Sequence, residues 1–410
     1  KGLRLLGIDQ DSPDPPDGLI LRDHSRRPLG IIEDAPAMRY YDQISAVKGE
    51  AAAQVLRPAF QALHAQGVTT IMDARALEET FEAIEYVQGQ GWLTLRLSGA
   101  REIAALDCPT ASEAEGAVLA AKAFIERYDQ GEPKPGPGIS LKSLKFFVDG
   151  MPTLGTAYLG EPYFENLGTA ESPEWRRGSS RGEPYFSADR LKALFKAAAK
   201  HGLNPHCHVI GDGAAAIALD AVEEAREAHP NVDFRPALAH LDVMTPDLYR
   251  RMAQARAVAV LSFQWAGQPD ELIELQRNMF GPARFEGLET HAKFVDAGAL
   301  VAYGSDWPID PLNEWANFQV GLTRRMIGPT PEAFARLAND RDLTLAEVLR
   351  AATANAAYAL GLEKSLGSLE PGKLADLAVV KGSLLRARPF EIAGTKVLRT
   401  VVGGRTVYQA

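Results

Sequence analysis

Apolar and polar positions follow two alternating periods along most of the chain. Stretches rich in Ala and charged residues have helical spacing, and each is followed by a Gly and a short apolar run typical of a strand. Residues 50–65 indicate a helix that Pro58 must kink or interrupt, and Gly67 ends it before a strand at 68–73. The same order returns at 187–208, where Ser187 can cap the helix, and at 288–306.

Short apolar runs at seven places are strand candidates, separated by helical stretches long enough for crossovers. They lie at residues 68–73, 93–99, 143–148, 203–209, 236–241, 257–263 and 299–305. Periodicity leaves two topologies open. One is a doubly wound open sheet, and the other is an eight-stranded (β/α)₈ barrel (a TIM barrel) whose first strand lies upstream of residue 1.

The two ends of the chain have different patterns from the middle. Thr344 and Glu347 form a predicted capping box for a helix at 344–359. Residues 374–380 and 396–408 alternate like short strands, with Gly403-Gly404 as a turn. We therefore divide the chain into residues 1–49, a loop-rich remnant of an upstream insertion, residues 50–360, the barrel, and residues 361–410, the strands of a small β-domain.

Composition narrows the class of protein. The chain has 410 residues, of which 46% are hydrophobic, which is enough for a large core. Its net charge of −9 offers no basic surface for phosphates, so we expect no nucleic-acid partner. No apolar run reaches the ~20 residues that span a bilayer, so we expect no membrane association. The two cysteines, Cys108 and Cys207, fit a reducing cytoplasm. Since the first Met is Met38, we expect a fragment or a processed form.

Several enzyme classes are disfavoured by missing motifs. No Gly-x-Gly-x-x-Gly follows the first strand candidate, and no Gly-Lys-Ser/Thr phosphate loop is present. A Ser–His–Asp hydrolase needs a Gly-x-Ser-x-Gly turn, which is also missing. The sequence therefore disfavours a nucleotide-binding enzyme and a serine hydrolase.

Ionisable residues at the ends of strand candidates carry the chemical signal, because barrels and open sheets both place active sites there. Lys145 lies in the apolar run 144–148, where a lone ammonium is costly to bury. It either pairs with Asp149, extends to the strand end, or is carbamylated to a carboxylate that bridges two metal ions.

Histidines give the second part of this signal. His206 and His208 alternate with period two and point to one side of their strand, an arrangement that can bind zinc but is only moderately specific. Taken singly, each is more often a core or surface histidine. His240 and Asp306 each end a further apolar run. Asp306 could instead cap the next helix.

The remaining histidines are expected to be solvated, because they lie in predicted loops or helices. They are His24, His64, His201, His229 and His291. Four aromatic residues near strand ends line an apolar pocket or simply pack, and they are Tyr158, Tyr163, Trp265 and Trp307.

These blocks together resemble the amidohydrolase superfamily, in the family 3 branch that includes N-substituted formamide deformylase-like proteins. The matching blocks are Pro13-Asp14-Pro15-Pro16 with Arg22-Asp23, Gly67-Val68-Thr69-Thr70, Lys145–Gly150, His208–Asp212, His240, Gly304-Ser305-Asp306, Thr323-Arg324 and Gly367–Asp376. The resemblance implies a (β/α)₈ barrel with a composite β-sandwich made from both chain ends. It thereby favours the barrel over the open sheet.

The resemblance also implies a ligand set. It makes Lys145 the fourth-strand metal ligand, His208 the fifth, His240 the sixth, and Asp306 the eighth-strand ligand and catalytic base. Four neighbours are expected to contact the substrate or support the ligands, namely His206, Asp149, Asp212 and Trp307. The family's first-strand His-x-His pair has no counterpart here, so we expect a chain truncated after that strand, which would bind metal poorly.

The expected activity is metal-dependent hydrolysis of a C–N amide-type bond in a small molecule, such as an N-substituted formamide. One or two divalent ions, with zinc favoured, would activate water, and Asp306 would pass its proton to the departing amine. The rival hypotheses are a deaminase using the same site and a catalytically inactive scaffold. A homodimer is the candidate assembly.

Overall fold

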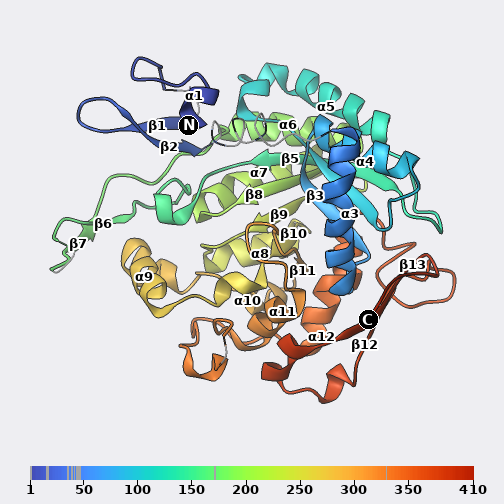
Figure 1. Cartoon of the computed structure of the whole chain (residues 1–410). Coiled ribbons are helices and arrows are strands. Elements are labelled where there is room, and N and C mark those ends of the chain that lie inside the picture. The colour runs from blue at the N-terminus through green and yellow to red at the C-terminus, as the bar shows by residue number, and fades with distance from the viewer. Residues whose placement is uncertain are drawn as a thin grey trace.

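A seven-stranded parallel sheet forms the centre of the molecule (Figure 1). The computed structural model describes residues 2–410 except 15–17, 35–36, 38–39, 41, 43–47, 170–171 and 329. The strands are β3 (Thr70–Ala76), β4 (Arg96–Glu102), β5 (Ile139–Phe147), β8 (Asn204–Val209), β9 (Ala237–His240), β10 (Val258–Leu261) and β11 (Leu300–Tyr303). Each strand predicted from an apolar run is confirmed.

The order of the strands decides between the two topologies. They run β3-β4-β5-β8-β9-β10-β11, so that each strand pairs with the next strand of this sheet along the chain. A doubly wound sheet would reverse this order at a switch point, and no reversal occurs. Among the described residues, no strand pairs with the outer edges of β3 and β11. The sheet is a curled (β/α)₈ barrel lacking one strand.

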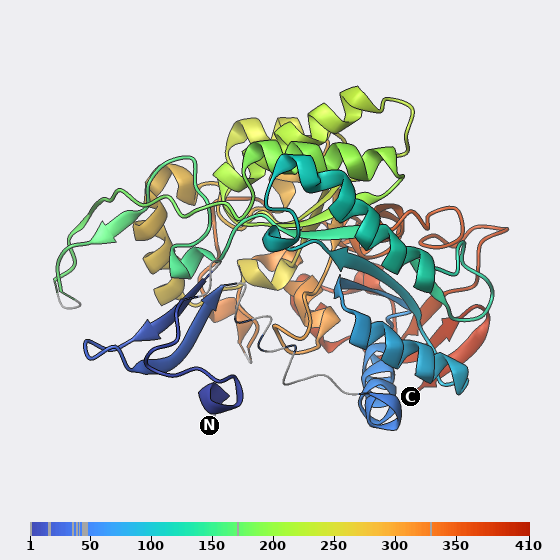
Figure 2. The ribbon, with the colours of Figure 1, turned by 90° about the horizontal axis from the view of Figure 1, so that it is seen from above.

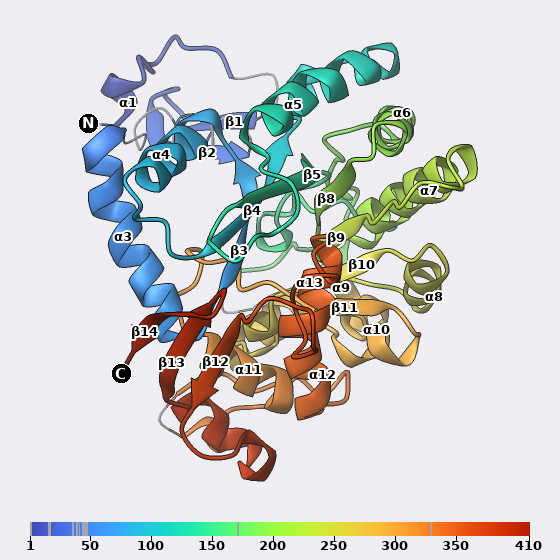
Figure 3. The ribbon, with the colours of Figure 1, turned by 90° about the vertical axis from the view of Figure 1, so that its right-hand side faces the viewer.

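Helices surround the outer side of the sheet (Figure 3). Those connecting or flanking the strands are α3 (Gly49–Ala65), α4 (Glu78–Gly89), α5 (Ala114–Tyr128), α6 (Ala188–Lys200), α7 (Asp212–Ala228), α8 (Pro246–Gln254), α9 (Asp270–Phe285), α10 (Ala292–Asp296), α11 (Glu314–Thr323), α12 (Leu345–Arg350) and α13 (Ala356–Ala359). The inner face of α7 is a stripe of buried small residues, including Ala214, Ala218 and Ala221. These small side chains let α7 pack closely on its neighbours.

The predicted helix signals are largely confirmed. Ser187 Oγ accepts a hydrogen bond from Arg190 N at 3.4 Å, and Thr344 and Glu347 form the reciprocal capping box. Pro58, on the exposed side of α3, does not break the helix, which is continuous from Gly49 to Ala65. The expected interruption at this proline is therefore wrong.

The loop-rich interpretation of residues 1–49 needs a correction. A short helix, α1 (Gly2–Leu5), precedes an antiparallel hairpin of β1 (Gly18–Arg22) and β2 (Pro28–Asp34). The hairpin buries little besides Ile20, which is 2% exposed. Since a strand with so little buried surface has no clear apolar period, the turn-forming residues around it dominated the pattern. Pro15 and Pro16 of the family motif lie outside the described residues.

A second hairpin, β6 (Phe164–Asn166) with β7 (Trp175–Arg177), was also not predicted. Figure 2 shows both hairpins projecting from the same side of the molecule, while the C-terminal strands lie on the other side. Those C-terminal strands form an antiparallel sheet in the order β12 (Leu377–Val380), β13 (Val397–Val402), β14 (Arg405–Gln409). Gly403 and Gly404 join the last two strands with φ of 55° and 81°, values that favour glycine.

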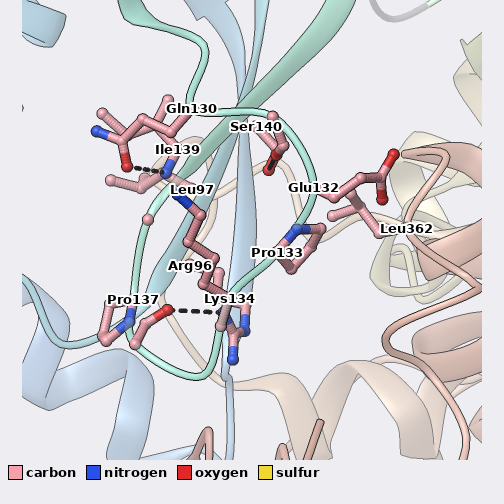
Figure 4. A pocket seen from close by; sticks show the side chains of 13 residues that line it. Arg96, Leu97, Gln130, Glu132, Pro133, Lys134, Pro137, Ile139, Ser140 and Leu362 are labelled. Carbon is pink, nitrogen blue, oxygen red and sulfur yellow. Dashed lines mark hydrogen bonds between the residues drawn. The ribbon is translucent and has the colours of Figure 1, made fainter. Parts of the chain in front are cut away.

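Arg96 joins the barrel to this C-terminal sheet. Its guanidinium donates to both carboxylate oxygens of Asp376, at 2.7 and 3.1 Å. It also donates to the carbonyl oxygens of Lys134 and Gly136 at 2.6 and 2.9 Å, beside a small cavity between β4 and the loop before β5 (Figure 4). The two side chains of the ion pair are 4% and 5% exposed. The pair is therefore buried and fully hydrogen-bonded.

We expect Arg96→Ala to destabilise the fold by about 3–5 kcal/mol, because it leaves the Asp376 carboxylate buried without its cation, with the Gly403 N–H as its remaining donor. Thermal and urea unfolding would measure this. Arg127→Ala is the matched control, since Arg127 pairs with Glu78 where the side chains are 53% and 39% exposed. The control should cost below about 1 kcal/mol. Equal losses in the two variants would contradict a structural role for the Arg96 pair.

His64 is not solvated, contrary to expectation. It is fully buried on the inner face of α3, with Nδ1 2.9 Å from Val68 O and Nε2 2.9 Å from Thr94 Oγ1. His291 is buried too, at 2% exposure, whereas His24 is exposed and His201 and His229 are half-buried. Helical spacing after Phe60 places His64 on the apolar stripe, and this position decides its burial.

Burial lowers the pKa of His64, while the Val68 carbonyl acts in the opposite direction. The unfolded chain then binds more protons than the folded one as pH falls below about 6.5, so stability is lost on acidification. We expect the urea midpoint to fall further between about pH 7.5 and about pH 5.5 in the wild type than in His64→Gln. Parallel pH profiles of the two proteins would show that His64 does not contribute.

No helix among the described residues has the length and apolar content needed to cross a bilayer.

Candidate active site

The parallel pairing of the strands brings the candidate ligands predicted from the sequence to one end of the sheet. Lys145 of β5 lies opposite His206 of β8, and Val209 lies opposite His240 of β9. Because the carboxyl ends of parallel strands share one edge, His208, His240 and Asp306 leave the sheet on the same side as Lys145. The rings of His208 and His240 meet edge to face, with centroids 4.6 Å apart. Residues distant in the sequence are thus assembled in one place.

Lys145 is buried in this group. Its side chain is 4% exposed, and Nζ lies 4.4 Å from the centroid of the Phe147 ring. Burial lowers the pKa of Lys145 to about 8, while the negative charge of Asp306 acts in the opposite direction. Among the described residues Lys145 has no ion pair with any carboxylate, so the pairing with Asp149, one of the alternatives that the sequence left open, is not found.

Asp149 binds backbone N–H groups instead of Lys145. Its fully buried carboxylate accepts the backbone N–H groups of Tyr158, Ile210 and Gly211, at 2.8, 2.9 and 2.9 Å. Burial raises its pKa to about 7, against the effect of these three donors. Asp212 similarly accepts Gly160 N at 2.8 Å. Both aspartates join the loop after β5 to the loop after β8, so the structure places them as supports of the strand ends.

The imidazoles are buried and neutral. Burial lowers the pKa of His206 and of His208 to about 3, with the Lys145 charge adding to the effect. The pKa of His240 is lowered well below its usual value, first by burial and then by the neighbouring His208, Lys145 and His206. His208 Nε2 lies 3.3 Å from Gly150 O, while His240 Nδ1 is buried without a hydrogen-bond partner among the described residues. Neutral imidazoles keep a lone pair for a cation.

Two of the candidate ligands, His240 and Asp306, have an unusual backbone conformation. His240, Leu241 and Asp306 have φ of 79°, 60° and 56°, in the left-handed region that non-glycine residues rarely adopt. Such conformations persist where the surrounding structure enforces them, and they gather at functional sites. Arg26, Arg256, Glu289 and Arg324 share this conformation, so at the exits of β9 and β11 it adds to the side-chain evidence and does not replace it.

Asp306 is a half-buried carboxylate at the exit of β11. Burial raises its pKa, the Lys145 charge lowers it, and the Asp310 charge raises it. The alternative role as a helix cap is wrong, because Asn313 caps the following helix by accepting Ala316 N at 3.3 Å. Trp307, next to Asp306, is 38% exposed at the rim.

Sequence reasoning missed two buried acids beside this group. Asp242 is 4% exposed and its Oδ1 has no partner among the described residues. Burial raises its pKa well above normal, and the charges of Asp149 and Asp306 add to this. Burial raises the pKa of Glu289 well above normal too, with Asp242 as a neighbour. Because β9 ends at His240 and Leu241 has a φ of 60°, the alternation of a strand does not extend to Asp242, and no local pattern indicated its burial.

The types of side chain present suit a divalent cation, but too few of them lie together to complete its ligand set. Among the described residues no three His, Cys, Asp or Glu side chains form a group that could hold a metal ion. His208 and His240 offer two neutral imidazoles whose rings are in contact. A complete site needs a further donor, which Lys145 would supply only as a carbamate.

This fold and site define a class: a parallel barrel enzyme scaffold with imidazole, lysine and carboxylate groups at the carboxyl ends of its strands. The family model described as "Amidohydrolase family" matches residues 1–408. The chain belongs to the amidohydrolase family.

Relatives agree with this assignment. N-substituted formamide deformylase of Arthrobacter pascens is 24% identical over 99% of this chain and 70% of its own length. Across three curated relatives the chain spans 66%, 71% and 70% of their lengths. An uncharacterised metal-dependent hydrolase from Pyrococcus horikoshii has the same fold, with a TM-score of 0.71 and 18% identity over 95% of this chain and 70% of that one. Atrazine chlorohydrolase TrzN from Arthrobacter aurescens, complexed with zinc, gives a TM-score of 0.54 and 18% identity over 90% of this chain and 74% of that one.

Proposed function

We propose that this chain carries most of the active site of a metal-dependent hydrolase that cleaves an amide-type C–N bond. The observation that carries the proposal is the convergence of two neutral imidazoles, a buried amine and a carboxylate at one end of the barrel. His208, His240, Asp306 and a carbamylated Lys145 would hold the cation. Membership of the amidohydrolase family supports this function.

A bound divalent cation, with zinc favoured by the imidazole ligands, would lower the pKa of water and polarise a substrate carbonyl. The chain's own residues do the rest. His208 and His240 stay neutral because they are buried, so each keeps a free lone pair. The raised pKa of Asp306 suits a group that accepts a proton from water and returns it to the departing nitrogen.

The substrate class is proposed from the relative that acts on N-substituted formamides. The test is a panel of N-substituted formamides and simple amides with the zinc-supplemented protein, following the release of amine and carboxylate. Turnover that depends on zinc and disappears in His240→Ala supports the proposal. Release of ammonia from amidine-like rings, with no amide cleavage, would replace it with a deaminase.

A non-catalytic scaffold is the second candidate, favoured by the incomplete ligand set among the described residues. It predicts that the purified protein carries no stoichiometric zinc and hydrolyses no member of the panel. Metal analysis by mass spectrometry, run beside the activity panel, separates the two candidates.

A further inference from the structure

The orientation of His240 needs an explanation. Metal-binding histidines usually donate their second ring nitrogen to a carboxylate or carbonyl oxygen, which fixes the ring. Nδ1 of His240 is buried and has no such partner among the described residues. His240 is the last residue of β9 and has a φ of 79°, so regular strand geometry does not set the direction of its side chain. Something other than a hydrogen bond to Nδ1 must hold the ring.

Trp265 provides the contact. Its ring lies flat on the His240 ring, with centroids 4.9 Å apart and planes inclined by 15°. His208 packs against the same imidazole edge to face, at 4.6 Å and 63°. The imidazole is thereby confined by two aromatic rings. Trp265 lies in the short 3₁₀ turn Phe263–Ala266 after β10. The ring that stacks on His240 of β9 therefore comes from the neighbouring strand's exit.

Trp265 is itself fixed by a carboxylate from the loop after β11. Its Nε1–H donates to Asp310 Oδ2 at 2.8 Å. Gln264 donates to the same oxygen at 3.1 Å and to Ser305 O at 2.7 Å. The exits of β10 and β11 are further joined by Ser262 Oγ, which donates to Gly304 O at 2.8 Å. The indole therefore has little freedom to rotate away from His240.

We propose that Trp265, held by Asp310, is a positioning residue that fixes the His240 imidazole by stacking, in place of the hydrogen bond that usually does so. The inference rests on the proposed function, because it takes His240 as a cation ligand. It assigns to Trp265 and Asp310 a role that acts through His240, without contact to the reacting atoms.

The first test measures zinc affinity by competition with a chromophoric chelator. Trp265→Leu removes the stack and should weaken zinc binding about 10-fold or more, the range seen when groups supporting a metal-bound histidine are removed. Trp265→Phe keeps an aromatic face and should recover most of the affinity. Trp92→Leu is the control, because Trp92 precedes β4 at the other end of the barrel and should leave affinity unchanged.

Asp310 is tested with two variants of equal charge. Asp310→Asn keeps an oxygen that can accept the indole N–H, whereas Asp310→Ala does not. Only Asp310→Ala should weaken zinc binding beyond the effect of lost charge, which both variants share. If Asp310 acts through Trp265, the double variant Asp310→Ala/Trp265→Leu should bind zinc no more weakly than Asp310→Ala or Trp265→Leu alone once that charge effect is subtracted.

A second readout does not depend on zinc. With only 8 histidines, ¹³C-labelled histidine gives a spectrum simple enough to assign by substitution. Stacking should shift the His240 ring protons upfield in the wild type, and Trp265→Leu should remove this shift. Loss of the shift together with weakened zinc binding supports the inference. Unchanged zinc affinity in Trp265→Leu overturns it and leaves the proposed function standing. Unchanged zinc affinity in His240→Ala overturns the ligand assignment itself.

Discussion

Asp306→Asn is expected to lower kcat by about 10²–10⁴-fold on any amide that the protein turns over, with a much smaller change in KM. Asn keeps an oxygen that can face a cation but cannot accept a proton. Water would then lose its base, and the leaving nitrogen would lose its acid. Steady-state kinetics of purified wild-type and variant proteins, each with its zinc content measured, would test this.

The control for this variant is Asp247→Asn, which removes a carboxylate on α8 that is 62% exposed and, among the described residues, pairs only with Arg250. It should leave kcat unchanged, since it changes the net charge by the same amount away from the site. Turnover in Asp306→Asn within a few-fold of the wild type would refute the assignment of Asp306 as the base. A rise in KM alone would make Asp306 a binding residue.

Lys145→Met is expected to produce two effects of opposite direction. Zinc content should fall to about a tenth or less, because the variant lacks the amine that a carbamate requires. The melting temperature should stay equal or rise, since a charge that is 4% exposed is replaced by an apolar chain of similar volume. Metal analysis and thermal unfolding of the same sample would measure both.

Chemical rescue sharpens this test. In Lys145→Ala the side chain leaves a space beside Phe147, and added propionate could occupy it and supply the missing carboxylate. Recovery of zinc content with propionate, but not with propanol, would support a carbamate ligand. Full zinc content in Lys145→Ala without any additive would exclude Lys145 from the site.

Local pattern was sufficient for much of the fold. Each of the seven barrel strands was predicted because a strand buried on both faces is an apolar run bounded by Gly and polar residues. Ser187 and Thr344 predicted where their helices begin, because an N-cap hydrogen bond joins residues three apart in the sequence. The hairpins β1–β2 and β6–β7 were missed, since strands that bury little leave no apolar period.

Local pattern also predicted where the candidate site lies, because it showed where the strands end. His240 and Asp306 end apolar runs, and Lys145 and His208 lie within strand candidates near their carboxyl ends, so the positions of all four were known before their distances were. Asp242 and Trp265 lie just beyond strand ends as well, yet nothing in their local sequence indicates burial or stacking. His64 and His291 were misjudged because their burial depends on what packs over them.

The sequence by itself determined which segments are strands and helices, where they end, and which ionisable residues stand at those ends, because such features depend on contacts within a few residues. Only the tertiary structure decided that the strands follow one another around a curled sheet. It also decided that Lys145 is buried without an ion pair among the described residues, and that the His240 ring lies on Trp265. The physical reason is that these properties arise between segments far apart in the chain, whose meeting depends on how all the helices and strands pack together.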